Sequence, residues 1–174
     1  LDGYADTSDA LSSYGDREKK LEILKDPHCG AFAVIRLCTY FLAYFCVAFC
    51  IRFSPRVGLC WTLALVLERG LSGLAVAAFP MAKNTGLAHT FATAADRESV
   101  QKILIVLSVL LAAALIALGG GALVAAALLV LWRYHHVAVK EFGGITGDLA
   151  GWFLQKAEFW MLAALAASQW GGIL

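Results

Sequence analysis

The sequence predicts an all-α, polytopic membrane protein: a bundle of about five transmembrane helices preceded by an acidic helical segment. Of its 174 residues, 60% are hydrophobic and 16% are charged, and the mean hydropathy is +0.73. A soluble domain would carry about a quarter charged residues. Long apolar runs begin at residue 30, whereas residues 1–27 are polar. We therefore expect one membrane-embedded domain over 1–174, with an acidic motif segment at 1–27 and a transmembrane bundle at 28–174.

Within the polar segment, the sequence predicts two short helices. Gly15 breaks the first, Asp16 can cap a second from about Arg17 to Lys25, and Pro27 ends it. The apolar runs follow at residues 30–51, 57–82, 103–132 and 149–170. As one helix, the run 103–132 would be about 45 Å long, which exceeds the ~30 Å hydrocarbon core of a bilayer. The glycines at 119–121 offer a turn at its middle, so we expect two spans there and five in all.

The positions of the basic residues support this hairpin and predict an orientation. With the hairpin, nine loop Lys and Arg fall on one side of the membrane and two on the other, whereas a single helix gives seven against four. The steeper bias predicts that the side with nine is cytoplasmic. The net charge of +1 gives no sign of a nucleic-acid partner. The nine are Arg17, Lys19, Lys20, Lys25, Lys83, Arg97, Lys102, Arg133 and Lys140, and the two are Arg52 and Arg56.

Three aspartates open the chain. Asp2, Asp6 and Asp9 are spaced by four and three residues, so a helix would place them on one face. Clustered carboxylates repel one another unless a cation lies between them, and oxygen ligands suit Mg2+. Gly3 and Ala5 lack bulk, so a partner backbone or a large substrate could approach closely. The spacing alone equally fits a solvated acidic helix start that the helix dipole favours.

A second polar element precedes the last apolar run, with the sequence Gly143-Gly144-Ile145-Thr146-Gly147-Asp148. Its glycines would let backbone amides approach an anion at a helix N-terminus. Asp148 could instead cap that helix. The predicted topology places this segment and Lys83 on the same face as the acidic motif.

Charged residues also occur inside the apolar runs. Glu68 and Arg69 lie near the middle of the second run, where a charge should face the bundle interior or a watery cavity. Arg69 suits a bidentate phosphate contact, although the two residues could equally form a structural pair. Glu158 lies in the last run and is also a candidate buried carboxyl. The five cysteines form no CxxC pair, so we expect reduced, buried thiols.

Several motifs together resemble cobalamin synthase, the adenosylcobinamide-GDP ribazoletransferase family. The most specific is Leu-Asp-Gly-Tyr-Ala-Asp-Thr-Ser-Asp at 1–9, followed by Gly-Asp-Arg-Glu at 15–18 and Leu-Glu-Ile-Leu-Lys-Asp at 21–26. Gly-Ala-Phe at 30–32 and the Gly-Gly-Ile-Thr-Gly-Asp segment at 143–148 continue the pattern. Order and spacing agree along nearly the whole chain.

The resemblance implies a multi-pass enzyme of the bacterial inner membrane that completes cobalamin biosynthesis. In that family a ribose hydroxyl of α-ribazole, or of its 5'-phosphate, attacks the pyrophosphate of adenosylcobinamide-GDP. GMP leaves, adenosylcobalamin or its phosphate forms, and Mg2+ is required. By this resemblance Asp2, Asp6 and Asp9 would hold the metal and perform the catalysis, and association with other cobalamin-assembly enzymes is expected. Candidate substrate-binding residues are Asp16, Lys25, Asp26, Arg69, Lys83, Thr146 and Asp148.

The chain also departs from the family pattern. Gln155 stands where the family has the first of two acidic residues, and Glu158 keeps the second. Lys83 replaces an Arg, which keeps the charge but loses the bidentate fork. The family carries membrane spans before the Asp-Gly motif, so we expect an upstream region to be missing here.

Two other functions compete with this interpretation. CDP-alcohol phosphotransferases also cluster aspartates at a membrane face, but their motif has Ala-Arg where this chain has Ala5-Asp6. A transporter or membrane-embedded binding protein would instead use Glu68, Arg69 and Glu158 as an ion path. A truncated, inactive gene product is a third alternative.

Overall fold

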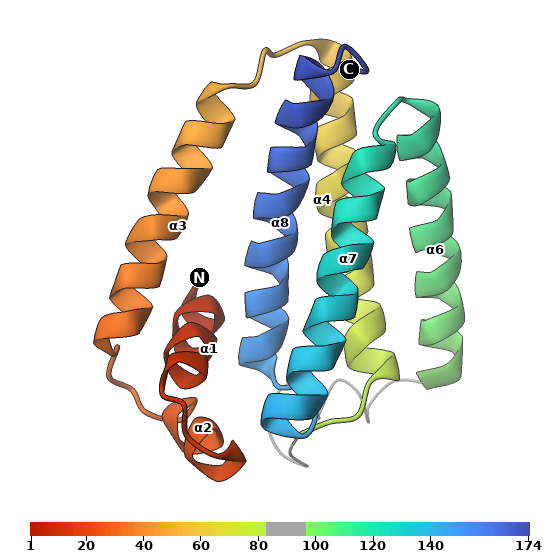
Figure 1. Cartoon of the computed structure of the whole chain (residues 1–174). Helices are drawn as coiled ribbons and strands as arrows, with labels where there is room; N and C mark the ends of the chain where they lie inside the picture. Colours follow the sequence, from red (N-terminus) through yellow and green to blue (C-terminus); the bar gives the residue numbers. More distant parts are fainter. Residues whose placement is uncertain (83–96) are drawn as a thin grey trace.

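The computed structural model describes residues 1–82 and 97–174, and every named element in these ranges is helical. Figure 1 shows long helices running side by side, with two short helices against one end of the bundle. This architecture confirms the predicted all-α membrane helix bundle. The elements are α1 (Asp2–Ser12), α2 (Arg17–Ile23), α3 (Ala31–Phe49), α4 (Pro55–Ala78), α6 (Arg97–Ala117), α7 (Gly121–Val137), the π-helical turn η1 (Ala138–Phe142) and α8 (Gly147–Trp170).

Four helices in the described ranges are long and apolar enough to cross a membrane: α3, α4, α6, and α7 continued through η1. The predicted count of five is therefore not confirmed. The helix α8 has 24 residues and packs against α7, α4, α1 and α3, but Gln155, Lys156 and Glu158 interrupt its apolar sequence. The predicted hairpin is present, because α6 ends at Ala117 and Gly119 turns the chain with a φ of +89°. Figure 1 shows α6 and α7 as neighbours on either side of this turn.

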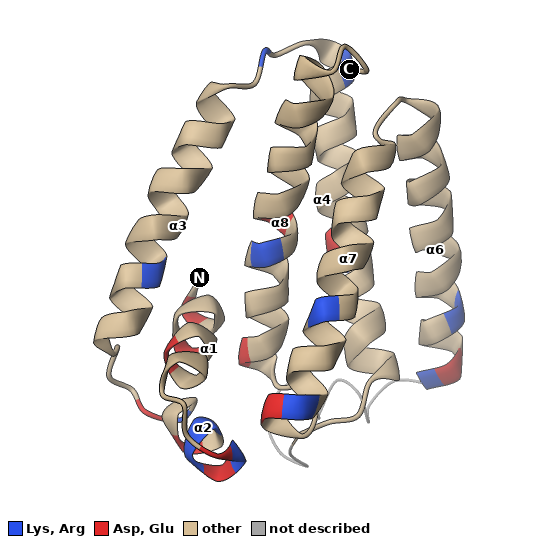
Figure 2. Cartoon of the chain, viewed as in Figure 1, with Lys and Arg blue, Asp and Glu red and all other residues tan. Residues whose placement is uncertain are grey.

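The charged residues gather at one end of the bundle. Figure 2 shows most of the charged segments at the end that carries α1 and α2, with basic segments also near the loop between α3 and α4 at the other end. This distribution is the one that the predicted grouping of basic residues requires. The cytoplasmic assignment of the charged end stays a prediction.

The polar segment folds largely as its turn signals predict. The carboxylate of Asp16 caps α2 by accepting a hydrogen bond from the backbone N–H of Lys19 at 2.9 Å. However, α2 ends at Ile23 rather than at Lys25. The N–H of Lys25 and the N–H of Asp26 each bond a carbonyl three residues back, so the last turn tightens before Pro27 is reached.

The cysteines are free, but four of them are not buried as predicted. Only Cys60 of the five is buried, and three of the exposed ones, Cys38, Cys46 and Cys50, lie in or just after α3. The reason is the position of α3 at the edge of the bundle, where Ala33 and Tyr40 alone are buried within the helix. Most of its apolar surface therefore faces outward, as expected for a helix in contact with lipid.

Glycines bring α1 into direct contact with α8. A Cβ atom on Gly3 would lie 2.5 Å from the carbonyl oxygen of Asp148 and 2.7 Å from its Cα, so no larger side chain fits. A Cβ on Gly151 would lie 3.5 Å from the Cα of Gly3. Small residues allow two membrane helices to approach this closely. Beside the contact, Tyr4, Thr7 and Ala10 of α1 are buried.

A salt bridge anchors the segment after α1. The ammonium of Lys20 in α2 lies 2.6 Å from a carboxylate oxygen of Glu141 in η1, and Lys20 is only 8% exposed. Arg17 adds a hydrogen bond to the backbone carbonyl of Val139 at 3.5 Å. The two short helices are thus attached to the connection that leads into α8.

We expect Gly3→Ala to destabilise the protein by about 1–3 kcal/mol, because the added methyl group meets backbone atoms that cannot turn aside. Thermal unfolding of the detergent-solubilised protein measures the change. Gly147→Ala is the matched control, since a Cβ there meets nothing within 4 Å. Equal effects of the two substitutions would contradict the proposed backbone contact.

A double-mutant cycle on Lys20→Met and Glu141→Gln should give a coupling energy of about 1–3 kcal/mol, because the pair is largely shielded from water. The same cycle on Lys19→Met and Glu22→Gln serves as the control. That pair also lies close, at 2.9 Å, but its side chains are 58% and 71% exposed. We expect its coupling to stay at or below about 0.5 kcal/mol. Similar couplings in both cycles would show that the Lys20 contact does not anchor α2.

Candidate functional site

The acidic face of α1 comprises Asp2, Asp6 and Asp9, and the fold adds a fourth carboxylate to it. The pKa of Asp6 is raised above its usual value, first by burial and then by the negative charges of Asp2, Asp148 and Asp9. Asp148 belongs to the first turn of α8 and reaches this group because Gly3 packs on its backbone. We call these four residues the acidic cluster. It joins the two sequence motifs that lie farthest apart in the chain.

The chemistry of the acidic cluster fits a hard divalent cation held partly by water and by substrate. Within residues 1–82 and 97–174, no three His, Cys, Asp or Glu side chains converge into a ready-made metal centre. Mg2+ usually keeps several waters and binds through one or two carboxylates together with substrate phosphates. All four residues offer only oxygen ligands, and the pKa of Asp6 is raised first by burial and then by its three acidic neighbours. The residues present therefore fit Mg2+ bound with a phosphate-containing substrate.

Asp9 has a second neighbour in the start of α3. Gly30 is the N-cap of α3, and a Cβ atom there would overlap the carboxylate of Asp9. With any larger residue at position 30, the carboxylate of Asp9 would have to move. The carboxylate consequently lies beside the N-terminus of α3, where the helix dipole favours negative charge.

The Gly-Gly-Ile-Thr-Gly-Asp segment is held against the end of α4. Gly144 has a φ of +154°, and a Cβ on it would lie 2.5 Å from the backbone nitrogen of Ala82. Ile145 donates its N–H to the carbonyl of Pro80 at 2.8 Å and accepts from the N–H of Ala82 at 3.0 Å. Thr146, rather than Asp148, caps α8, because its hydroxyl accepts from the N–H of Leu149 at 3.2 Å. Asp148 is thus left in the first turn, beside Asp6.

The structure does not bring every predicted residue to the acidic cluster. Asp16 is occupied as the cap of α2, and Lys25 is exposed in the loop after it. Asp26 accepts hydrogen bonds from the backbone and ring of His28, which lower its pKa. Arg69 is 61% exposed on α4, with its Nε 3.5 Å from a carboxylate oxygen of Glu68. Lys83 lies outside the described residues.

Sequence reasoning missed a large cavity on the other side of α1. Its volume is about 980 Å³, and it lies among α1, α7 and α8, with the side chain of Arg36 reaching it from α3. Three of the basic residues that line it, Arg36, Arg133 and Lys156, come from different helices. A signal was present, because Arg36 and Lys156 are lone cations in apolar runs, where charge marks a polar interior. Aromatic and further charged side chains complete much of the lining: Tyr4, Tyr14, Lys20, Trp132, Glu141, Trp152 and Trp160.

Comparison with known proteins gives a consistent match. The family described as "Cobalamin-5-phosphate synthase" matches residues 1–166. The adenosylcobinamide-GDP ribazoletransferase of Lachnoclostridium phytofermentans is 41% identical over 169 residues, which cover 95% of this chain and 63% of that protein. The proteins of that name from Pseudomonas syringae pv. tomato and Geobacillus sp. are each 33% identical, over 95% and 92% of this chain and 68% and 63% of theirs.

The chain therefore spans about two thirds of the length of these relatives. No solved structure matches it. The family match covers both motifs of the acidic cluster, and it extends through most of α8. The chain belongs to the cobalamin-5-phosphate synthase family.

Proposed function

We propose that the protein to which this chain belongs is an adenosylcobinamide-GDP ribazoletransferase that requires Mg2+. The observation that carries the proposal is the acidic cluster, in which the first turn of α8 joins the face of α1. Relatives with that name match the chain across both elements. The cluster would face the cytoplasm of a bacterial cell, at the surface of the inner membrane.

The proposed reaction is a phosphoryl transfer between two substrates. A ribose hydroxyl oxygen of α-ribazole, or of its 5'-phosphate, attacks the phosphorus attached to the cobinamide. The bond from that phosphorus to the GMP oxygen breaks, and the hydroxyl proton passes to a carboxylate of the acidic cluster. The products are a phosphodiester, which is adenosylcobalamin or its 5'-phosphate, and GMP. In phosphoryl transfer the protein contributes mainly by positioning the two substrates and by neutralising the charge on the phosphates.

The residues of the acidic cluster would divide this work. Asp2, Asp6 and Asp9 would hold Mg2+, which neutralises charge on the pyrophosphate. Asp148 extends the oxygen donors from α8, and Thr146 fixes that turn by capping it. Gly3 keeps the two helices close enough for both sets to face one substrate.

We expect Asp6→Asn to lower the release of GMP by a factor on the order of 100 or more, the size typical of losing one preorganised charge-stabilising group. Membranes with the full-length protein would receive adenosylcobinamide-GDP, α-ribazole 5'-phosphate and Mg2+, and chromatography would quantify GMP. Removing Mg2+ with EDTA should abolish release from the wild type.

Two control substitutions make this experiment decisive. Glu22→Gln changes an exposed carboxylate on α2 and should leave GMP release intact. Glu68→Gln replaces a buried carboxyl inside α4 and should also leave release largely intact, because Glu68 is not in the acidic cluster. Loss of GMP release in Glu68→Gln with full activity in Asp6→Asn would place the reaction at the charges inside the bundle instead of at the acidic cluster. No GMP release from well-inserted wild type would contradict the proposal outright.

Asp6→Asn should raise the stability of the metal-free protein and reduce the stabilisation that added Mg2+ gives. Because the pKa of Asp6 is raised in the fold, its ionised form destabilises the folded state at neutral pH. In EDTA, Asp6→Asn should therefore unfold a few degrees above the wild type. Added Mg2+ should stabilise the wild type, by about 2.7 kcal/mol at 100 times its dissociation constant, and the variant much less. Thermal unfolding in detergent gives both numbers, and an identical Mg2+ response in the two proteins would rule out a metal on Asp6.

A further inference from the structure

Three cations converge on the cavity behind α1. Arg36 of α3, Arg133 of α7 and Lys156 of α8 all line it, and the charges of Arg36 and Arg133 act on Lys156. In the part of the chain that the structure describes, none of the three forms an ion pair with an acidic side chain. The ammonium of Lys156 lies over the ring of Tyr4, 5.4 Å from the ring centroid. Like charges brought together without a paired carboxylate of their own favour the binding of an anion.

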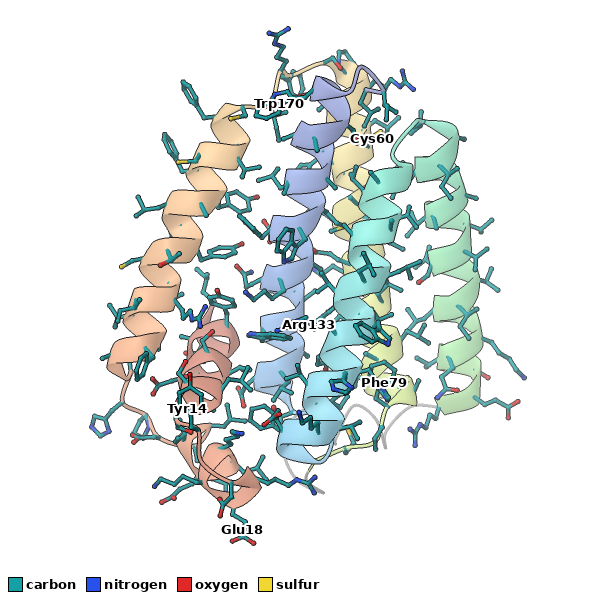
Figure 3. The ribbon with its side chains drawn as sticks, in the orientation of Figure 1. Tyr14, Glu18, Cys60, Phe79, Arg133 and Trp170 are labelled. Atoms are coloured by element: carbon teal, nitrogen blue, oxygen red, sulfur yellow. The ribbon has the colours of Figure 1, made fainter. Side chains whose placement is uncertain are left out.

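Lys156 is half-buried and Arg36 and Arg133 are exposed, but Lys156 and Arg133 lie far along the bundle from its charged end. Lys156 is nine residues beyond the start of α8, and Arg133 is nine residues before the end of η1. At 1.5 Å per residue, each lies about 14 Å from the connection between η1 and α8. Arg133, labelled in Figure 3, accordingly lies well up the bundle from Tyr14 and Glu18. A long side chain can reach the membrane surface from near a helix end, as Arg36 could, but this does not explain three cations that share one cavity.

The aromatic residues that line the cavity indicate which chemical group the anionic ligand carries. Trp152 is buried, Trp160 and Trp132 are half or more exposed, and Tyr4 and Tyr14 line the cavity from the side of α1. Indole and phenol rings stack readily on flat aromatic groups. The fourth lining cation, Lys20, is already paired with Glu141. A volume of about 980 Å³ is at the upper end for a small-molecule pocket, so it admits a ligand the size of a nucleotide.

We propose that this cavity binds a phosphate ester with a flat aromatic group, with Arg36, Arg133 and Lys156 around the phosphate and Trp152 and Trp160 beside the ring system. The identity of the ligand rests on the proposed function, which supplies two groups of this kind: α-ribazole 5'-phosphate and the guanosine end of adenosylcobinamide-GDP. We assign the cavity to the first, because the pyrophosphate of the second is proposed to lie at the acidic cluster. The 5'-phosphate does not react in that transfer. The cavity would thus select the phosphorylated nucleoside by a group remote from the reacting hydroxyl.

Direct binding tests this without turnover. Full-length protein in phosphatidylcholine nanodiscs, without Mg2+ or adenosylcobinamide-GDP, would be titrated with α-ribazole 5'-phosphate, α-ribazole and inorganic phosphate. Tryptophan fluorescence reports occupancy, because three tryptophans line the cavity. We expect the phosphorylated nucleoside to bind at least about tenfold more tightly than either other probe. Arg133→Gln and Lys156→Gln should each erase that preference while α-ribazole itself still binds.

Arg52→Gln is the matched control, since Arg52 lies beyond the other end of α3 and should keep the wild-type preference. Equal affinity for the nucleoside and its phosphate in the wild type would overturn the proposal. So would a preference that survives both cavity variants. Nanodiscs with phosphatidylglycerol test whether the cavity binds a lipid phosphate instead. The cavity would be assigned to lipid if phosphatidylglycerol competes with the nucleotide and if phosphatidylcholine nanodiscs show no preference for the phosphorylated nucleoside. GMP release is measured separately, so a failed transferase assay and a failed binding assay remain distinguishable.

Discussion

The backbone contact between Gly3 and Asp148 is the constraint on which the candidate site depends. It sets α1 directly on the first turn of α8, and it thereby brings Asp148 to Asp6. It also fixes the rotation of α1 about its own axis. Because the face with Gly3 contacts α8, the other faces of α1 point away from that contact. The aspartates consequently lie away from Tyr4 and Ser8, which line the cavity. One close approach of two backbones thus determines where both charged regions lie.

Clustered carboxylates work against this contact, because their repulsion raises the free energy of the docked α1. The fold opposes the repulsion with anchors on both sides of the acidic cluster. On one side, Lys20 of α2 pairs with Glu141. On the other side, Ile145 forms hydrogen bonds with Pro80 and Ala82, which follow α4. These bonds hold the start of α8 in place. The acidic cluster is therefore held together by contacts between residues that lie outside it.

Local features were predictable from sequence, and features that depend on helix register were not. The cap at Asp16, the turn at Gly119 and the shared face of Asp2, Asp6 and Asp9 follow from a few neighbouring residues. The sequence offered Asp148 as a possible cap of α8, whereas Thr146 two residues earlier caps it. The outward position of Arg69, the exposed cysteines of α3 and the cavity cations depend on how distant helices rotate and pack. Hydropathy marks such charges as unusual, but it does not say which of them meet.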